Sequence, residues 1–183
     1  MAENKDRLFL STQQVDAVLL DIASQIHAEC TDEFALVGIR SRGVPLAKEL
    51  AEKLKEKFKK NVKVGILDIN LYRDDLTEVS DQPILQKTEI GFPIQSMGII
   101  LVDDVLYTGR TIRAAMDALI DYGRPRYIKL AALVDRGWRE LPIEANFVGK
   151  KIKTSADEVV KVMCKEIDGK NEVWVKSHFN KRT

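Results

Sequence analysis

The sequence predicts an α/β fold in which helices flank a central parallel sheet. Short, continuous apolar runs alternate along the chain with segments whose apolar residues recur at helical spacing. The runs have the length of strands that are buried on both faces, as the strands of a parallel sheet are. No internal repeat, low-complexity tract or linker divides the 183 residues, so one domain is expected over residues 1–183, with right-handed crossovers between strands.

The first helix is predicted to begin near Ser11. Ser11 and Gln14 have the spacing of a capping box, in which each side chain bonds the backbone N–H of the other residue. The apolar residues that follow share one helical face: Val15, Val18, Leu19, Ile22 and Ile26. Residues 34–39 (FALVGI) then form a continuous apolar run, which predicts a buried strand.

A second helix is expected after the loop Arg40-Ser41-Arg42-Gly43, with Leu46, Leu50, Leu54 and Phe58 on one side. Residues 62–72 (VKVGILDINLY) are predicted to form the next strand. The polar stretch 73–96 has neither a helical nor a strand period. Because a loop of this length is uncommon inside a compact domain, the stretch is interpreted as a flexible functional loop of the kind that closes over a site.

The second half of the chain continues the alternation. Residues 97–102 (MGIILV) predict a fully buried strand that leads directly into a pair of aspartates. An amphipathic helix is expected next, ending at Gly123. Residues 127–134 (YIKLAALV) predict a further strand, and two strand-like runs around the turn DGKN predict a hairpin near the C-terminus.

The composition argues against several classes of protein. The formal net charge is +1, whereas a protein that binds nucleic acid through general phosphate contacts is usually far more basic. The N-terminal residues lack the apolar core of a signal peptide, and no apolar run is long enough to span a bilayer. Cys30 and Cys164 have no metal-ligand spacing and are interpreted as reduced thiols. A soluble, cytoplasmic protein is expected.

Asp103 and Asp104 stand where the most apolar predicted strand ends. In a parallel α/β sheet, ligands bind beyond the carboxyl ends of the strands. Two adjacent acids at such a place repel each other and lose hydration, so a purely structural role has little to recommend it. The two carboxylates are well suited to accept hydrogen bonds from neighbouring hydroxyls, such as the 2′ and 3′ groups of a ribose.

The residues after the aspartates predict an anion site at the start of a helix. Gly109 allows the backbone to approach a ligand closely, while Thr108 and Thr111 supply hydroxyl groups. The first N–H groups of the helix point outward with the positive end of its dipole, which favours a phosphate. The alternative is a turn whose Asp and Thr residues serve only as caps, but the complete string favours a ribose 5-phosphate site.

The string ILVDDVLYTGRT resembles the signature of type I phosphoribosyltransferases, which binds phosphoribosyl pyrophosphate (PRPP). Further segments resemble the pyrimidine operon regulator (PyrR) family: GIRSRG (38–43), DINLYRDDL (68–76), ILVDDVLYTGRTIRAAMDALIDYGRP (100–125), LVDRG (133–137), RELPI (139–143) and VGKKI (148–152). This resemblance implies the type I phosphoribosyltransferase fold, with a small hood and a C-terminal β-hairpin over about residues 135–183. It also implies that the flexible loop, about residues 73–96, closes over the substrate.

The resemblance implies a role for each part of the site. Asp103 and Asp104 would hold the ribose hydroxyls. The 5-phosphate would be bound by Tyr107, Thr108, Gly109, Arg110 and Thr111, and the pyrophosphate by Arg40, Ser41, Arg42 and Gly43. A solvated turn is the alternative for the two arginines of that loop. Arg73 would add a pyrophosphate contact or, equally, pair with a neighbouring aspartate. The base would lie against Val134, Asp135 and Arg136.

The implied reaction is displacement at C1 of PRPP by a nitrogen of a nucleobase. By resemblance the base is uracil and the products are UMP and pyrophosphate, although the residue types alone do not separate a pyrimidine from a purine. Mg²⁺ would be carried mainly by the oxygens of PRPP and by water, with no direct protein ligands. A homodimer or homotetramer is expected.

Regulatory members of the family also bind pyrimidine-operon messenger RNA on a basic face. Arg139 and Lys150 remain compatible with that role. Other positions depart from the pattern: Leu20, Asp21 and Ser24 align where Thr, Arg and His are usual, Trp138 where His is usual and Glu144 where Arg is usual. Added acids repel phosphates, so transferase activity is expected to persist while RNA-based attenuation is weakened. Trp138 could stack on a base, but packing is favoured.

Overall fold

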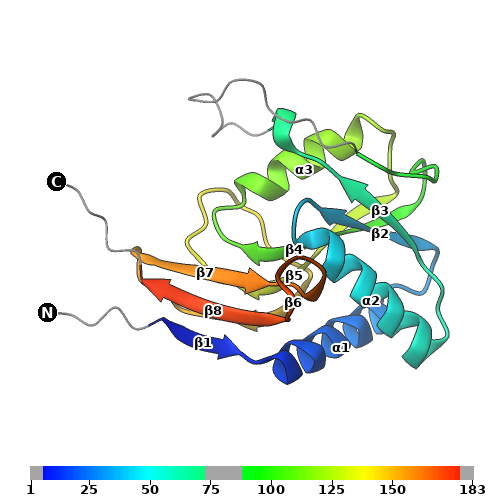
Figure 1. Ribbon diagram of the computed structural model, residues 1–183. Coiled ribbons are helices and arrows are strands. Elements are labelled where there is room, and N and C mark those ends of the chain that lie inside the picture. Colours follow the sequence, from blue (N-terminus) through cyan, green and yellow to red (C-terminus); the bar gives the residue numbers. More distant parts are fainter. Residues whose placement is uncertain (1–5, 73–87, 178–183) are drawn as a thin grey trace, which may run out of the picture.

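A five-stranded parallel sheet forms the centre of the computed structural model, which describes residues 6–72 and 88–177 (Figure 1). The strand order is β3-β2-β4-β5-β6. The bounds are β2 (Phe34–Ile39), β3 (Lys63–Leu67), β4 (Gly98–Leu106), β5 (Tyr127–Asp135) and β6 (Phe147–Lys151). Helices α1 (Thr12–Glu29) and α2 (Gly43–Phe58) cover one face, and α3 (Arg110–Ile120) covers the other. The predicted α/β fold with flanking helices is confirmed.

Alternate residues of the central strands serve two separate cores. Leu36 and Val102 pack with α1 and α2, whereas Val37 and Leu101 pack with α3. Both β2 and the first six residues of β4 are buried on both faces, as their continuous apolar runs predicted. The capping box at Ser11 is also present, with reciprocal bonds between this residue and Gln14.

The sheet has a topological switch point between β2 and β4. After β2 the chain crosses through α2 to β3 on one side, and after β4 it crosses through α3 to β5 on the other side. The two neighbouring strands therefore send their loops in opposite directions, which opens a crevice beyond their carboxyl ends. Residues 40–43 follow β2, and the residues after Leu106 follow β4, so both loops border this crevice.

A small antiparallel sheet forms the hood. Its order is β1-β8-β7, with bounds β1 (Arg7–Leu10), β7 (Glu158–Met163) and β8 (Glu172–Ser177). The predicted hairpin is formed by β7 and β8, with the short helix α4 (Lys165–Asp168) between them. The N-terminal strand β1 was not predicted and pairs with β8. Likewise, β6 was assigned to the hood range 135–183 but belongs to the central sheet, where it pairs with β5.

The strand predicted over residues 62–72 is shorter in the structure. β3 ends at Leu67, and a short 3-10 helix, η1 (Asn70–Tyr72), follows. The side chain of Asp68 causes this change of direction because its Oδ1 accepts the N–H of Asn70 at 2.9 Å. The next helix, α3, ends at Ile120, three residues before the expected Gly123.

The predicted flexible loop lies only partly within the described residues. Residues 73–87, including Arg73, lie outside them. Residues 88–96 are described, and Glu89 forms an antiparallel bridge with Ile66 at the edge of the sheet, while Ile94 is buried. Among the helices of residues 6–72 and 88–177, none has the length and apolar character that crossing a bilayer requires.

Candidate active site

Asp103 and Asp104 lie near the carboxyl end of strand β4, at the switch point of the sheet. Asp103 is only 7% exposed. One oxygen of each carboxylate accepts a backbone N–H of the next residue: Asp104 N–H for Asp103, and Val105 N–H for Asp104. Burial raises the pKa of Asp103 well above its ordinary value, and the adjacent charge of Asp104 raises it further. Burial likewise raises the pKa of Asp104, with the Val105 N–H and the Arg42 guanidinium partly opposing it.

These shifts mean that the fold alone does not favour a pair of charged carboxylates here. A buried carboxylate with a raised pKa costs free energy at neutral pH unless a ligand supplies hydrogen-bond donors. Such pairs are characteristic of functional sites. Two buried carboxylates of this kind are suited to hydroxyl donors, and the ribose-binding role of the Asp pair stays a prediction.

The loop of residues 40–43 lies directly against the end of β4. A Cβ atom on Gly43 would come within 2.2 Å of the carbonyl oxygen of Val102, so only glycine permits this approach. The contact places the first turn of α2 beside the Asp pair. The peptide bond between Arg40 and Ser41 is cis, which is an unusual backbone geometry for a non-proline residue. Arg42 forms an ion pair with Asp168 of α4 at 3.1 Å.

The turn of residues 107–111 begins α3 with Gly109 at the N-cap. Gly109 has φ 93°, a left-handed conformation that favours glycine. Thr108 accepts the N–H of Arg110 with its hydroxyl at 3.3 Å, which tightens the turn. Its carbonyl accepts the N–H groups of Glu140 and Leu141. The turn is thus supported from behind, and the positive end of the α3 dipole lies at this turn, where it favours an anion.

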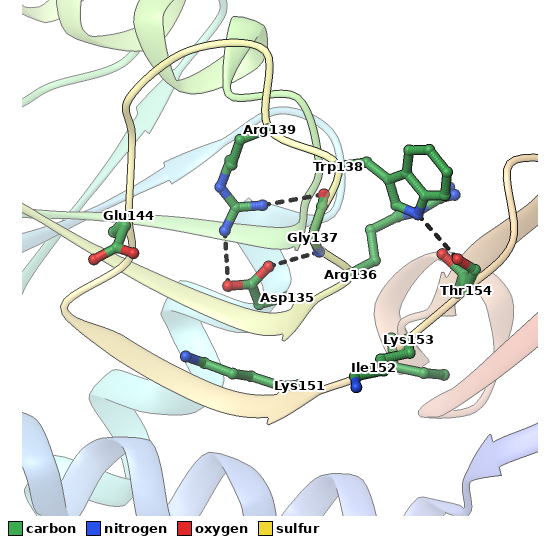
Figure 2. Close-up of a pocket in the computed structure, with 10 residues that line it drawn as sticks. All are labelled: Asp135, Arg136, Gly137, Trp138, Arg139, Glu144, Lys151, Ile152, Lys153 and Thr154. Carbon is green, nitrogen blue, oxygen red and sulfur yellow. Dashed lines mark hydrogen bonds and ion pairs between the residues drawn. The ribbon is translucent and has the colours of Figure 1, made fainter.

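Arg139 joins the turn to the segment that follows β5. Its guanidinium pairs with Asp135 at 2.7 Å, as Figure 2 shows, and its other N–H groups donate to the carbonyls of Tyr107, Gly137 and Ile143. Four protein acceptors therefore hold one side chain. A second link runs in parallel, because the guanidinium of Arg136 lies 4.0 Å from the centre of the Tyr107 ring.

A cavity of about 800 Å³ opens beside these links. Its walls come from the segment after β5 and from the end of β6 with the residues that follow: Asp135, Arg136, Gly137, Trp138, Arg139, Glu144, Lys151, Ile152, Lys153 and Thr154 (Figure 2). Val134 is fully buried in β5, immediately before the first residue of this wall. Within the described part of the chain, the Nε of Arg136 and the hydroxyl of Thr154 are buried without a hydrogen-bond partner. A polar ligand in the cavity could satisfy both groups.

Comparison with known proteins agrees with this geometry. The family model described as Phosphoribosyl transferase domain matches residues 9–168. A protein named Bifunctional protein PyrR from Acetivibrio thermocellus is 60% identical over 144 residues, which cover 79% of this chain and 78% of that protein. Its namesake from Syntrophobacter fumaroxidans is 49% identical over 177 residues, with coverage of 96% and 95%. This chain belongs to the PyrR family.

Solved structures share the fold at low sequence identity. A hypoxanthine-guanine phosphoribosyltransferase from Bacillus anthracis has a TM-score of 0.70 at 20% identity, covering 96% of this chain and 99% of that one. A hypoxanthine phosphoribosyltransferase from Trypanosoma cruzi has a TM-score of 0.71 at 16% identity, covering 97% and 94%. The PyrR chain therefore has the type I phosphoribosyltransferase fold, as the sequence predicted.

The positions that depart from the PyrR pattern have clear structural surroundings. On α1, exposed Asp21 accepts a hydrogen bond from Gln25, and the hydroxyl of Ser24 donates to the carbonyl of Leu20. Trp138 is 52% exposed, so the favoured packing interpretation describes only part of its surface. Its indole N–H donates to the carbonyl of Thr154 at 2.9 Å, which holds the ring at the rim of the cavity.

Several residues of this site were not predicted from the sequence. Thr154 reaches the cavity from a segment that had no motif of its own. Glu140 pairs with Arg110 at 2.6 Å, and Asp168 pairs with Arg42, across separations of 30 and 126 residues. No local spacing reveals contacts between such distant positions. The two charged partners could only have been found by knowing that α4 and the segment after β5 return to the switch point.

Proposed function

We propose that this PyrR chain is a uracil phosphoribosyltransferase that forms UMP and pyrophosphate from uracil and PRPP. The observation that carries the proposal is the buried Asp103–Asp104 pair, which lies between the glycine-capped turn of α3 and the loop of residues 40–43. A ribose with a 5-phosphate on one side and a pyrophosphate on the other needs these three parts side by side.

In the proposed reaction, N1 of uracil forms a bond to C1 of the ribose while the bond from C1 to the pyrophosphate oxygen breaks. The bonding electrons of that C–O bond leave with pyrophosphate, and the N1 proton passes to solvent. Positive charge develops on the sugar and negative charge on the leaving group, so positioning and electrostatics supply most of the rate. Arg42 and the N–H groups of its loop would stabilise the pyrophosphate, and the Mg²⁺ carried by PRPP would neutralise part of its charge.

The Asp pair would orient the sugar through its 2′ and 3′ hydroxyls. Hydrogen bonds from these hydroxyls would replace the water that both carboxylates lose on burial. They would offset the free-energy cost of burying charged carboxylates, which is the cause of the raised pKa values. Neither carboxylate is needed as a nucleophile. The pair is therefore proposed to bind and align the substrate, with Tyr107, Thr108, Arg110 and Thr111 placed around the 5-phosphate.

The cavity bordered by Asp135 and Arg136 is proposed as the site of the base. Uracil presents two carbonyl oxygens and an N3–H group, which complement an N–H donor and a hydroxyl. The buried Nε of Arg136 and the hydroxyl of Thr154 lack partners among the described residues, so they fit this edge chemistry. Asp135 is held by Arg139 and by the N–H of Gly137, which fixes the shape of the wall.

The proposal is tested by incubating the purified protein with PRPP, Mg²⁺ and one base at a time. Uracil should give UMP and pyrophosphate in equal amounts, measured by chromatography and by a pyrophosphate assay. Faster conversion of hypoxanthine or guanine than of uracil would mean that the substrate is a purine base. No consumption of uracil, hypoxanthine, guanine, adenine or xanthine would refute the transferase activity itself.

A second function, regulation through RNA, is favoured by the name of the relatives, which are called bifunctional. Exposed Lys150 and Lys151 lie on β6, and Lys151 lines the same cavity as the half-exposed Trp138. The guanidinium of Arg139, in contrast, is occupied by four protein acceptors, so it is a poor phosphate ligand. Exposed Asp21 and Glu144 would repel a phosphate backbone.

Filter binding with pyrimidine-operon leader RNA, with and without UMP, tests this second function. A regulator should bind with an affinity that falls steeply as salt rises, because phosphate contacts release counterions. Binding that neither salt nor UMP alters would remove the regulatory role and leave the transferase proposal intact.

A further inference from the structure

The short helix α4 contacts the loop of residues 40–43 although it belongs to the C-terminal hairpin. One terminal nitrogen of Arg42 donates to both oxygens of Asp168, at 3.1 and 3.3 Å, across a separation of 126 residues. The two side chains are 29% and 14% exposed. Because water is largely excluded, this ion pair is screened less than one on the open surface.

The Asp168 carboxylate also accepts a hydrogen bond from the backbone at the start of α4. Its Oδ2 accepts the N–H of Cys164 at 2.9 Å, and this bond, followed by the charge of Arg42, lowers the pKa of the carboxyl. The carboxylate is therefore ionised at neutral pH and has a fixed direction. A fixed acceptor can hold an arginine in one rotamer, whereas a mobile one cannot.

The hairpin is tied to α2 by two further contacts. Lys48 pairs with Glu166 at 2.8 Å, and the side-chain amide of Asn171 donates to both oxygens of Glu49 at 3.0 and 3.1 Å. Lys48 and Glu49 lie on the helix that begins at Gly43. The thiol of Cys164 also contacts the carbonyl oxygen of Arg42 at 3.9 Å, so the hairpin reaches both α2 and the loop, and Asp168 is its contact with the Arg42 side chain.

Arg42 retains hydrogen-bonding capacity for a ligand. Among residues 6–72 and 88–177, its Nε is one of the buried side-chain atoms without a hydrogen-bond partner. Its charge also acts on Asp104, where it partly opposes the rise in pKa that burial causes. Asp168 accepts from only one terminal nitrogen of the guanidinium, so Nε is not engaged by it.

We propose that Asp168 is a positioning residue, which holds Arg42 ready to receive the pyrophosphate of PRPP. This inference rests on the function proposed above. Without Asp168, the long side chain of Arg42 regains rotamer freedom, and substrate binding must restrict it again. The alternative is that Asp168 competes with pyrophosphate for Arg42, which predicts an effect of the opposite sign.

The main test is Asp168→Asn, which keeps the size of the side chain and an oxygen for the Cys164 N–H but removes the charge. The KM for PRPP should rise about tenfold, while kcat changes less than about threefold, because the lost contact acts on ground-state binding. The matched control is Glu166→Gln, which removes an acid from the same helix but pairs with Lys48, outside the loop. Its KM for PRPP should remain that of the wild type.

A binding measurement separates this inference from the proposed function. Magnesium pyrophosphate, titrated by calorimetry into each protein without any base, should bind the Asp168→Asn variant about tenfold more weakly than the wild type. Asp168→Glu retains the charge and should recover part of the lost affinity. In an Arg42→Gln background, Asp168→Asn should cause no further loss, since the two residues act through one contact.

Unchanged or tighter pyrophosphate binding in Asp168→Asn overturns the positioning role, and tighter binding would show competition. Equal weakening in Glu166→Gln also overturns it, because the hairpin as a whole would then be responsible. Thermal unfolding of each variant shows whether the fold is retained, and Asp168→Glu provides the test if the Asn variant does not fold. A wild type that binds pyrophosphate but converts no base would refute the proposed transferase alone.

Discussion

The two sides of the crevice, proposed to hold the sugar phosphate and the base, are stabilised in different ways. On the proposed sugar-phosphate side, backbone elements set the geometry: the Asp pair lies near the end of β4, and Gly109 is the N-cap of α3. On the base side, the cavity wall is held by side chains, chiefly Arg139 and Arg136. Backbone geometry depends on a short local string, whereas a side-chain wall depends on contacts between separate segments, such as that of Trp138 with Thr154. The difference predicts that substitutions on the two sides will have distinct consequences.

The largest effect is expected for Asp103→Asn combined with Asp104→Asn. The fold should persist because both carboxylates accept hydrogen bonds from backbone N–H groups, and the amide oxygen of Asn can accept the same bonds. Turnover should fall by about 1000-fold, since the sugar would lose its alignment. Steady-state kinetics with PRPP and uracil measure the loss, and circular dichroism checks the fold. A variant that keeps full activity would show that the pair does not hold the ribose.

Arg139→Gln should produce the next largest effect, because it breaks the link between the two sides. Loss of the ion pair with Asp135 and of three carbonyl contacts should lower the free energy of unfolding by about 2–4 kcal/mol. The KM values for PRPP and for uracil should both rise. Denaturant titration gives the stability change. The matched control, Arg113→Gln, alters an exposed ion pair with Asp117 and should lower the free energy of unfolding by less than about 0.5 kcal/mol. Equal losses of stability in the two variants would refute the proposal that Arg139 connects the two sides.

A smaller effect concerns the pH dependence of stability in the protein without ligand. The folded state raises the pKa of Asp103, so it binds this proton more tightly than the unfolded chain does. The resulting stabilisation is complete below the ordinary pKa of 3.8 and is lost as the pH rises through the folded-state pKa. At neutral pH, Asp103→Asn should therefore be more stable than the wild type by about 1 kcal/mol.

That difference should shrink as the pH falls toward 3.8, because the wild-type carboxyl then becomes neutral. Melting temperatures measured across this pH range test the sign. A variant that is less stable than the wild type at neutral pH, with a gap that narrows in acid, would mean that the carboxylate is stabilising in the absence of substrate.

The smallest effect is expected for Trp138→Phe. The ring is half exposed at the rim of the cavity, and the variant loses the hydrogen bond to Thr154 and part of the ring surface. Stability should change by less than about 1 kcal/mol. The KM for uracil should change about threefold, while the KM for PRPP stays constant. Equal changes in both KM values would show that the two sides of the crevice are not separable at this position.

The same contrast explains what could be predicted from the sequence. The strands FALVGI and MGIILV are short, apolar and bounded by polar or charged residues, so their burial and their alternation with helices along the chain were readable. The Asp pair and the glycine-capped turn were equally readable, because the chemistry lies in consecutive residues. For these parts, local sequence and tertiary structure agree.

Other parts depend on contacts that no local pattern carries. The strand expected over residues 62–72 stops at Leu67 because the Asp68 side chain bonds the backbone two residues ahead. The strands β1 and β6 are short, and their pairing is decided by partners far along the chain. Arg139 was interpreted as a residue compatible with RNA binding, yet its position among four acceptors gives it an internal role. Arg73 lies outside the described residues, so its role stays a prediction.

The pairing of β1 with β8 has a consequence for synthesis on the ribosome. Arg7 of β1 lies opposite Val175 of β8. During synthesis, β1 therefore has no pairing partner until β8 has been made. The central sheet, from β2 to β6, can already assemble during this interval. A nascent chain released before Glu172 would contain the Asp pair and its phosphate turn but would expose an unpaired strand edge, which is a template for aggregation. Residues 172–177 must therefore be synthesised before this edge is protected from strand-to-strand aggregation.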